Sequence, residues 1–252
     1  MKSIEFFGPP GSGKTYYQKK LRKFLINNNF KTYSFEENFY TNYSKINEIG
    51  FLNQIKFFLK SKLTDENNYI LKLTNYYFDR IIDFEKEHSK IINDKFSKKF
   101  LNEYFKIFNK NYKNFYLKKK LLKWLTREIA SKKISNKIFN NKMILINSEG
   151  IYQRLVRLLL NHKKKDIQNV MKKLKFKPFK SNFIIYVDSN LSKCLSNISN
   201  RQNDHHNKNE IRKFYEKSKL IYAINKKEIL TIKNNKDFFK TCKKIKKEID
   251  EA

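Results

Sequence analysis

The sequence predicts a three-layer α/β fold with a five-stranded, mostly parallel sheet and a large helical insertion between strands two and three. Five short strand-like segments alternate with stretches of helical spacing, which is typical of parallel sheets covered on both faces. A proline-free stretch of about 100 residues with helical spacing separates the second strand from the third. The chain has only 5 Gly and 3 Pro among 252 residues, too few for a turn-rich β-sandwich or barrel.

The expected elements follow from apolar runs and from apolar residues spaced three and four apart. Strands are expected at residues 3–7, 31–35, 142–146, 183–187 and 229–232. Helices are expected at 16–27, 191–200 and 236–250, with further ones inside the insertion at 51–63, 69–84, 96–108 and 115–129. We therefore expect one domain over residues 1–252, with the insertion at about 46–140.

Charge, cysteine content and hydropathy limit the classes of function. The formal net charge is +32, but only seven of the 56 basic residues are Arg, while Asn, Ile, Phe and Tyr are abundant. This composition is typical of AT-rich coding, so solvated surface lysines explain the charge better than a nucleic-acid partner, which is not favoured. Cys194 and Cys242 are too few for a disulfide scaffold or a multi-cysteine zinc site. With no apolar run of about 18 residues and no secretory signal, we expect a cytoplasmic protein without a membrane partner.

The segment between the first strand and the first helix matches a specific phosphate-binding motif. Its sequence at residues 8–15, Gly-Pro-Pro-Gly-Ser-Gly-Lys-Thr, fits the P-loop pattern G-x-x-x-x-G-K-[ST]. Glycines let backbone N–H groups approach phosphate oxygens, and the helix that follows adds its positive N-terminal end. The pattern predicts a P-loop NTPase fold in which Lys14 reaches the β- and γ-phosphates of ATP and Thr15 binds Mg²⁺. The expected ATP-binding residues are Gly8, Pro9, Pro10, Gly11, Ser12, Gly13, Lys14 and Thr15.

A carboxylate follows the third strand, where a P-loop NTPase holds Mg²⁺ through water. Residues 147–150 are Asn-Ser-Glu-Gly, so Glu149 is the candidate, and Gly150 permits a sharp turn. Arg154 lies one helical turn further along and is a candidate for substrate binding. The alternative for Glu149 is an ordinary acid at a helix N-terminus, where it interacts with the helix dipole.

The segment after the fourth strand has the character of a lid over a phosphate site. Residues 188–190, Asp-Ser-Asn, can cap a helix that ends near Arg201, and the polar stretch 202–207 follows. Arg201 could stabilise charge on a transferring phosphoryl group. The alternative is a surface loop with an incidental arginine. A solvated loop also explains His205 and His206 better than a metal site does, because no third ligand lies nearby.

Two acids, Glu36 and Glu37, follow the second strand, whose tip is expected to face the acceptor side of the phosphate site. Either acid could accept the proton of a substrate hydroxyl or bind that hydroxyl, and the alternative is a pair of solvated loop acids. Arg80 and Arg127 lie in helical segments of the insertion and could bind an acceptor phosphate or base. Surface ion pairs are the simpler interpretation of these two arginines.

The order of these parts resembles the nucleoside and nucleotide kinases of the P-loop class, thymidylate kinase and the deoxynucleoside kinases in particular. The resemblance rests on the P-loop, the Glu-Glu pair, the segment ILINSEG with its later arginine, and the segment FIIYVDSNLSKCLSNISNR. It covers roughly residues 1–38 and 142–250. It implies Arg201 as the lid arginine and Glu36 or Glu37 as the carboxylate after strand two.

Two departures bear on what the resemblance implies. The family's usual Asp-Arg pair after strand three is replaced here by Glu149 and Gly150, and Arg201 stands almost alone where the lid of the family carries several arginines. The insertion also occupies the region where family members recognise the base. The resemblance therefore implies the fold and the phosphate donor more firmly than the acceptor.

These features predict an ATP- and Mg²⁺-dependent kinase that moves the γ-phosphoryl group to a small acceptor, foremost a nucleoside or nucleoside monophosphate. Lys14 and Arg201 would stabilise the transition state, and Glu36 or Glu37 would orient the acceptor. The alternatives are a kinase for a sugar or another metabolite, and a non-enzymatic ATP-binding protein that docks on nucleic acid or a larger assembly. A GTPase is disfavoured, because residues 225–228, Asn-Lys-Lys-Glu, approach the N-K-x-D motif only as chance allows in a chain so rich in Asn and Lys. The oligomeric state stays open, with a homodimer among the forms considered.

Overall fold

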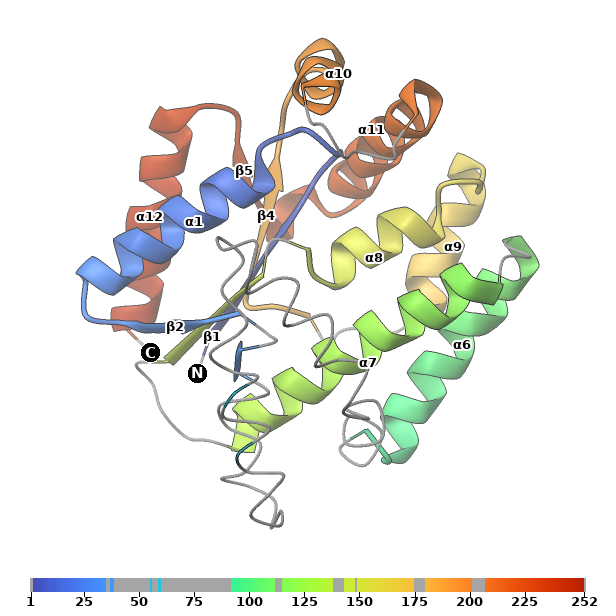
Figure 1. The fold of residues 1–252 in the computed structure, drawn as a ribbon, viewed down its shortest axis with the longest axis horizontal. Helices are drawn as coiled ribbons and strands as arrows, with labels where there is room; N and C mark the ends of the chain where they lie inside the picture. The colour runs from blue at the N-terminus through green and yellow to red at the C-terminus, as the bar shows by residue number, and fades with distance from the viewer. Residues whose placement is uncertain are drawn as a thin grey trace.

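The centre of the fold is a parallel β-sheet. The computed structural model describes residues 2–34, 37–38, 55, 59, 92–111, 115–137, 143–147, 149–174, 180–200 and 207–251. Within these residues the sheet has five strands in the order β2-β3-β1-β4-β5, and every pairing is parallel (Figure 1). The strands are β1 (Lys2–Phe7), β2 (Lys31–Tyr33), β3 (Met143–Asn147), β4 (Phe183–Val187) and β5 (Ile229–Ile232). The predicted α/β class is confirmed, with a described sheet that is parallel throughout rather than mostly parallel.

Helices connect the strands, and an asparagine side chain caps the N-terminus of several of these helices. The helices around the sheet are α1 (Lys14–Asn27), α8 (Ile151–Leu158), α9 (Lys164–Leu174), α10 (Leu191–Ser199), α11 (Lys208–Ile224) and α12 (Asn235–Asp250), with a 3₁₀ helix η3 (Lys226–Glu228). Asn190, Asn207 and Asn234 precede α10, α11 and α12, and each side chain accepts a hydrogen bond from the backbone N–H three residues later. The cap predicted within residues 188–190 is therefore Asn190.

Helices cover both faces of the sheet, and the alternation of side chains along each strand decides which layer a residue meets. Ile4 and Phe6 of β1 share an apolar cluster with residues of α1 and α12. Phe7 belongs to a second cluster, which includes residues of α8, α9 and α11. Figure 1 shows α1 beside α12, with α8, α9 and α11 on the other side of the sheet. Three layers result, as predicted. Within the described ranges, no helix combines the length and the apolar character of a membrane span.

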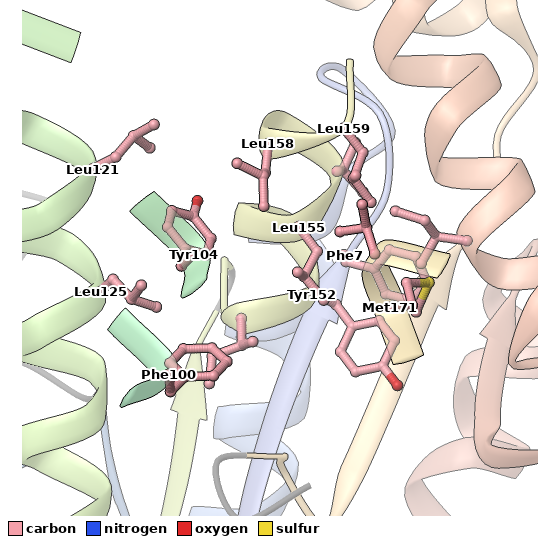
Figure 2. Packing of buried hydrophobic residues seen from close by; sticks show 14 of the residues in the cluster. Phe7, Phe100, Tyr104, Leu121, Leu125, Tyr152, Leu155, Leu158, Leu159 and Met171 are labelled. Atoms are coloured by element: carbon pink, nitrogen blue, oxygen red, sulfur yellow. The ribbon is translucent and has the colours of Figure 1, made fainter. Parts of the chain in front are cut away.

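The insertion contributes α6 (Lys95–Asn111) and α7 (Phe115–Lys137) to the described structure. They confirm the helices expected at 96–108 and 115–129, and both are longer than predicted. Figure 2 shows Leu125 of α7 and Tyr104 of α6 directed toward α8, which carries Leu155 and Leu158. The middle of α7 therefore packs on α8 rather than directly on the sheet. The helices expected at 51–63 and 69–84 lie outside the described residues, apart from single positions.

The boundaries of most elements differ from the predicted ones by one or two residues. β4 and β5 coincide with their predictions, β3 is shifted by one residue, and β2 ends at Tyr33 within the described residues. α10 ends at Ser199, with Asn200 as its cap. Neither α9 nor α11 was predicted, although apolar residues in both lie three or four positions apart, as Ile167 and Met171 of α9 do.

Candidate functional site

The P-loop forms a tight turn between β1 and α1. Gly8, Gly11 and Gly13 have positive φ angles of 150°, 78° and 96°, in a part of backbone space that L side chains rarely adopt. Gly11 is also confined by packing, since a Cβ there would lie 2.3 Å from the carbonyl oxygen of Cys194 in α10. Asn197 of α10 donates a hydrogen bond to the Gly11 carbonyl at 2.7 Å. The loop is therefore held against α10.

Lys14 and Thr15 begin α1 at the end of this loop. Lys14 is buried, and its Nζ donates hydrogen bonds to the carbonyl oxygens of Gly8 and Pro9 at 3.1 and 3.0 Å. Thr15 is exposed. The first turn of α1 contains no acidic residue, so its positive N-terminal end is not neutralised locally. These features fit the binding of phosphate groups at the loop.

A cavity of about 210 Å³ adjoins the P-loop and gathers several of the predicted residues. From the loop and α1 it is lined by Pro10, Gly11, Gly13, Lys14, Thr15 and Tyr16. From β3–α8 and α11 it is lined by Glu149, Gln153, Arg154, Arg157 and Phe214. The structure thus brings together Lys14, Thr15, Glu149 and Arg154, which come from two segments far apart in the sequence. We call this space the phosphate cavity.

A buried acid in β1, Glu5, fixes the start of α8 beneath this cavity. Its carboxylate accepts hydrogen bonds from the backbone N–H groups of Ile151 and Tyr152 at 3.2 and 3.1 Å, and from the Ser181 hydroxyl at 3.0 Å. Gln153 then accepts a hydrogen bond from the Gly8 N–H at 3.1 Å, which ties α8 to the P-loop. Neither residue was predicted from the sequence. For Glu5 a signal existed, because an acid inside a strand buried on both faces needs a partner.

Glu149 has a position and chemistry that suit Mg²⁺. Its side chain is 47% exposed at the cavity, and its Oε2 lies 3.4 Å from Nη1 of Arg154. A threonine hydroxyl and a carboxylate are hard oxygen ligands of the kind that Mg²⁺ prefers, and this ion usually keeps several waters when it binds with phosphates. Among the described residues there is no cluster of three or more His, Cys, Asp or Glu that could hold a metal alone. The donor set of Thr15 and Glu149 fits an ion that binds together with a nucleotide.

Arg154 is held in place by α7 of the insertion. Its Nε and Nη2 both lie 3.1 Å from Oε1 of Glu128, and its guanidinium stacks on Trp124 with 4.4 Å to the ring centroid. Burial raises the pKa of Glu128 to about 7, while the attraction of Arg154 opposes this shift. Arg154 was predicted from the sequence. Glu128 and Trp124 were not, because nothing in the local sequence signals a contact between α7 and α8.

Glu37 has a local structural role. Its N–H donates to the Ser34 hydroxyl at 3.0 Å, and its Oε2 accepts from the Ser34 N–H at 2.6 Å, which is a reciprocal capping box. Arg22 forms an ion pair with the same carboxylate at 3.1 Å. The Ser-x-x-Glu spacing is visible in the sequence and could have separated this role from that of Glu36. Glu36 itself lies outside the described residues.

Arg127 belongs to α7, and the remaining predicted residues fall outside the described part of the chain. These are Arg201, Arg80, His205 and His206. On the side of the P-loop that faces β4 and β5, a second cavity of about 360 Å³ is lined by residues of the loop, of α1, of the β4 and β5 ends and of α10: Ser12, Gly13, Tyr16, Tyr17, Val187, Asp188, Ser189, Asn190, Lys193, Asn197 and Lys233. The two described cavities share Gly13 and Tyr16 and so flank the start of α1.

Comparisons with known proteins found similarity among solved structures. No family model matches the chain, and no curated protein matches it. Among solved structures, the chain is similar to deoxyadenosine kinase from M. mycoides with dCMP and a flexible dCDP bound, at 10% identity and a TM-score of 0.48 over 99% of this chain and 100% of that one. It is also similar to the same kinase with dATP bound, at 11% identity and a TM-score of 0.47 over 98% and 100% of the two chains. Identities and TM-scores this low do not transfer an activity to this chain.

Proposed function

We propose that this protein is an ATP-dependent kinase that moves the γ-phosphoryl group to a small acceptor, foremost a nucleoside or nucleoside monophosphate. The observation that carries the proposal is the phosphate cavity, in which Lys14, Thr15, Glu149 and Arg154 surround one space beside the P-loop. The cavity lies at the carboxyl ends of the neighbouring strands β1 and β3, whose connections leave in opposite directions, since β1 leads to β2 on one side and β3 leads to β4 on the other. Open α/β sheets bind ligands at such switch points.

ATP is proposed to bind across the two cavities, with its phosphates at the P-loop. Backbone N–H groups of the loop and the N-terminal end of α1 would bind the phosphate oxygens. Lys14 would exchange its hydrogen bonds with the Gly8 and Pro9 carbonyls for bonds to the β- and γ-phosphates. The second cavity, at about 360 Å³, has the size and the mixed aromatic and polar lining of a site for the nucleoside part.

Transfer of a phosphoryl group depends on position and on stabilisation of charge. In the proposed reaction the bond between the γ-phosphorus and the oxygen that bridges it to the β-phosphorus breaks, and ADP leaves. A bond forms between the γ-phosphorus and the acceptor oxygen. Lys14 and Arg154 are placed to stabilise the charge on the phosphoryl oxygens, and Arg201 is proposed to join them from the lid. Mg²⁺, bound by Thr15 and through water by Glu149, would neutralise phosphate charge.

A carboxylate is proposed to take the proton of an acceptor hydroxyl. Of the two acids after β2, Glu37 is engaged by Ser34 and Arg22. The role of general base therefore goes to Glu36 in this proposal. Where the acceptor is a phosphate rather than a hydroxyl, no such base is needed, and Glu36 would bind the acceptor instead.

The test is transfer of labelled phosphate from ATP, with Mg²⁺, to a panel of nucleosides, nucleoside monophosphates and sugars. The expected result is labelling of one acceptor class, lowered by at least ~10²-fold in Lys14→Ala, because this variant loses a charge that acts in the transition state. Lys23→Ala is the matched control, since Lys23 lies on the same helix and is exposed. Full activity of Lys14→Ala would contradict the mechanism, and labelling of a sugar alone would favour the metabolite kinase over the nucleoside kinase.

A further inference from the structure

Glu128 of α7 is a buried carboxylate, and the described residues bind only one of its two oxygens. The residue is 3% exposed. Its Oε1 accepts from Arg154, whereas its Oε2 is buried and has no hydrogen-bond partner within the described part of the chain. A carboxylate that lacks half of its hydrogen bonds is costly to keep ionised in the interior. Its charge state therefore depends strongly on the groups around it.

Charged groups from three elements face Glu128. Arg154 of α8 is its direct partner, Lys132 comes from α7 itself, and Glu5 comes from β1. Lys132 donates to the Ser181 hydroxyl at 3.1 Å, and its Nζ lies 3.8 Å from Oε2 of Glu5, so it compensates Glu5 more than Glu128. Burial raises the pKa of Glu128 to about 7, Glu5 adds to this rise, and Arg154 and Lys132 oppose it. The carboxyl thus exchanges its proton near neutral pH.

Arg154 connects this carboxyl to the phosphate cavity. Its Nε and Nη2 point to Glu128, while Nη1 lies toward Glu149 at 3.4 Å and the side chain lines the cavity. Trp124 supports one face of the guanidinium. Tyr104 of α6 donates from its hydroxyl to the Arg154 carbonyl at 3.3 Å, which fixes the backbone as well. The insertion therefore sets the direction of the arginine and places a carboxyl against its charge.

We infer that Glu128 is a positioning residue and counter-ion that sets how strongly Arg154 binds an anionic group in the phosphate cavity. An ionised Glu128 cancels part of the guanidinium charge and weakens anion binding, whereas a protonated Glu128 leaves that charge available. Through Glu128, the helical insertion thus contributes to anion binding in the phosphate cavity. The inference rests on the proposed function only in taking this cavity as the place where phosphate groups bind.

The test uses sulfate, because it stays a dianion from pH 6 to pH 8 and so isolates the titration of the protein. Sulfate affinity is measured by calorimetry for the full chain, Glu128→Gln, Arg154→Gln and the double variant. Gln keeps an oxygen that can accept from Arg154 but carries no charge. At pH 8 we expect Glu128→Gln to bind sulfate roughly three- to ten-fold more tightly than the unchanged chain. We expect no such gain when Arg154 is already Gln, and none in Glu216→Gln, an exposed control on α11.

The pH profile provides the readout that a purely structural role would not change. Sulfate should bind the unchanged chain more tightly at pH 6 than at pH 8, and Glu128→Gln should lose the part of this dependence that belongs to Glu128. Binding should also take up protons near pH 7, because a bound anion raises the pKa of a neighbouring carboxyl. Proton uptake is read from calorimetry in two buffers of different ionisation enthalpy, and this measurement needs no variant to fold.

Several results would overturn the inference. These are an unchanged sulfate affinity in folded Glu128→Gln, an equal gain in the Arg154→Gln background, or an absence of proton uptake. A failure of the proposed function would look different. It would appear as the lack of phosphoryl transfer to every acceptor, while the sulfate results stayed as expected.

Discussion

At the turn from β3 into α8, Gly150 lies against the buried carboxylate of Glu5. A Cβ at Gly150 would be 2.2 Å from Oε2 of Glu5 and 2.7 Å from its Cβ. The same carboxylate accepts the first free N–H groups of α8. Glycine and acid therefore act together, because only a residue without a side chain lets the acid reach the helix that carries Gln153 and Arg154.

Gly150→Ala should lower the free energy of unfolding by roughly 2–4 kcal/mol, because the added methyl displaces a buried, fully hydrogen-bonded carboxylate. Urea unfolding of the full chain measures this change. Glu5→Asp provides the coupling control, since the shorter acid withdraws the carboxylate from the methyl group and so relieves part of the clash. The double variant should lose less stability than the sum of the two single variants. Additive losses, or no loss in Gly150→Ala, would show that the close contact is not the cause.

Residues in a local motif could be predicted from the sequence, whereas residues that act through distant partners could not. Lys14 and Thr15 were found because the P-loop is a local pattern whose chemistry requires those residues at that spacing. Glu128 was missed because its partner Arg154 is 26 positions away on another helix. Contacts between helices that are distant in sequence have no local signature, whereas a motif on one turn does.

Among the elements, the segment that follows β2 carries the acids Glu36 and Glu37, for which a catalytic role and a structural role compete. The capping box of Ser34 and Glu37 starts a helical turn directly after β2, and Arg22 of α1 joins it through the ion pair to Glu37. The Arg22 side chain also donates to the Thr32 hydroxyl at 3.2 Å, so it connects α1 with β2. This arrangement uses Glu37 for structure.

Alanine at each acid separates structure from catalysis. Glu37→Ala should lower the free energy of unfolding by about 0.5–2 kcal/mol, the usual cost of a lost helix cap, with kcat nearly unchanged. Glu36→Ala should lower kcat by roughly 10²-fold for a hydroxyl acceptor and leave stability nearly unchanged. Thermal unfolding and steady-state kinetics on the same two preparations measure both effects. The reverse pattern would assign the catalytic carboxylate to Glu37.

The predicted elements were most accurate where an apolar run is short and clearly bounded. β4 and β5 were placed correctly because short apolar runs are bounded on both sides by polar residues. α9 and α11 were missed although their apolar residues follow helical spacing, as do those of the lysine-rich α12, which was predicted. The helices α6 and α7 were found, but their packing on α8 was not, since an amphipathic pattern predicts a buried face without naming what covers it.

At the scale of the whole molecule, the net charge of +32 acts on every anionic ligand. On α12 several lysines pair with acids one turn further along, as Lys246 does with Asp250, yet basic residues outnumber acidic ones by 56 to 24 over the chain. The phosphate cavity adds Lys14, Arg154 and Arg157 to this field. Such an excess raises the rate at which an anion meets the protein, and salt screens the effect over about 8 Å at physiological strength.

Association of ATP should therefore slow by several-fold as the chloride concentration rises from about 0.02 to 0.3 M, because encounter is steered by charge that salt screens. The dissociation rate should change much less, since it depends on short contacts at the P-loop. Stopped-flow binding of a fluorescent ATP analogue measures both rates, and a fluorescent adenosine without phosphates is the control that should show little salt dependence. If ATP and adenosine responded alike, the excess of lysine would have no effect on substrate capture. A steep salt dependence of the association rate for ATP alone would mean that the lysine-rich surface, which follows from the composition of the chain, also speeds the binding of ATP.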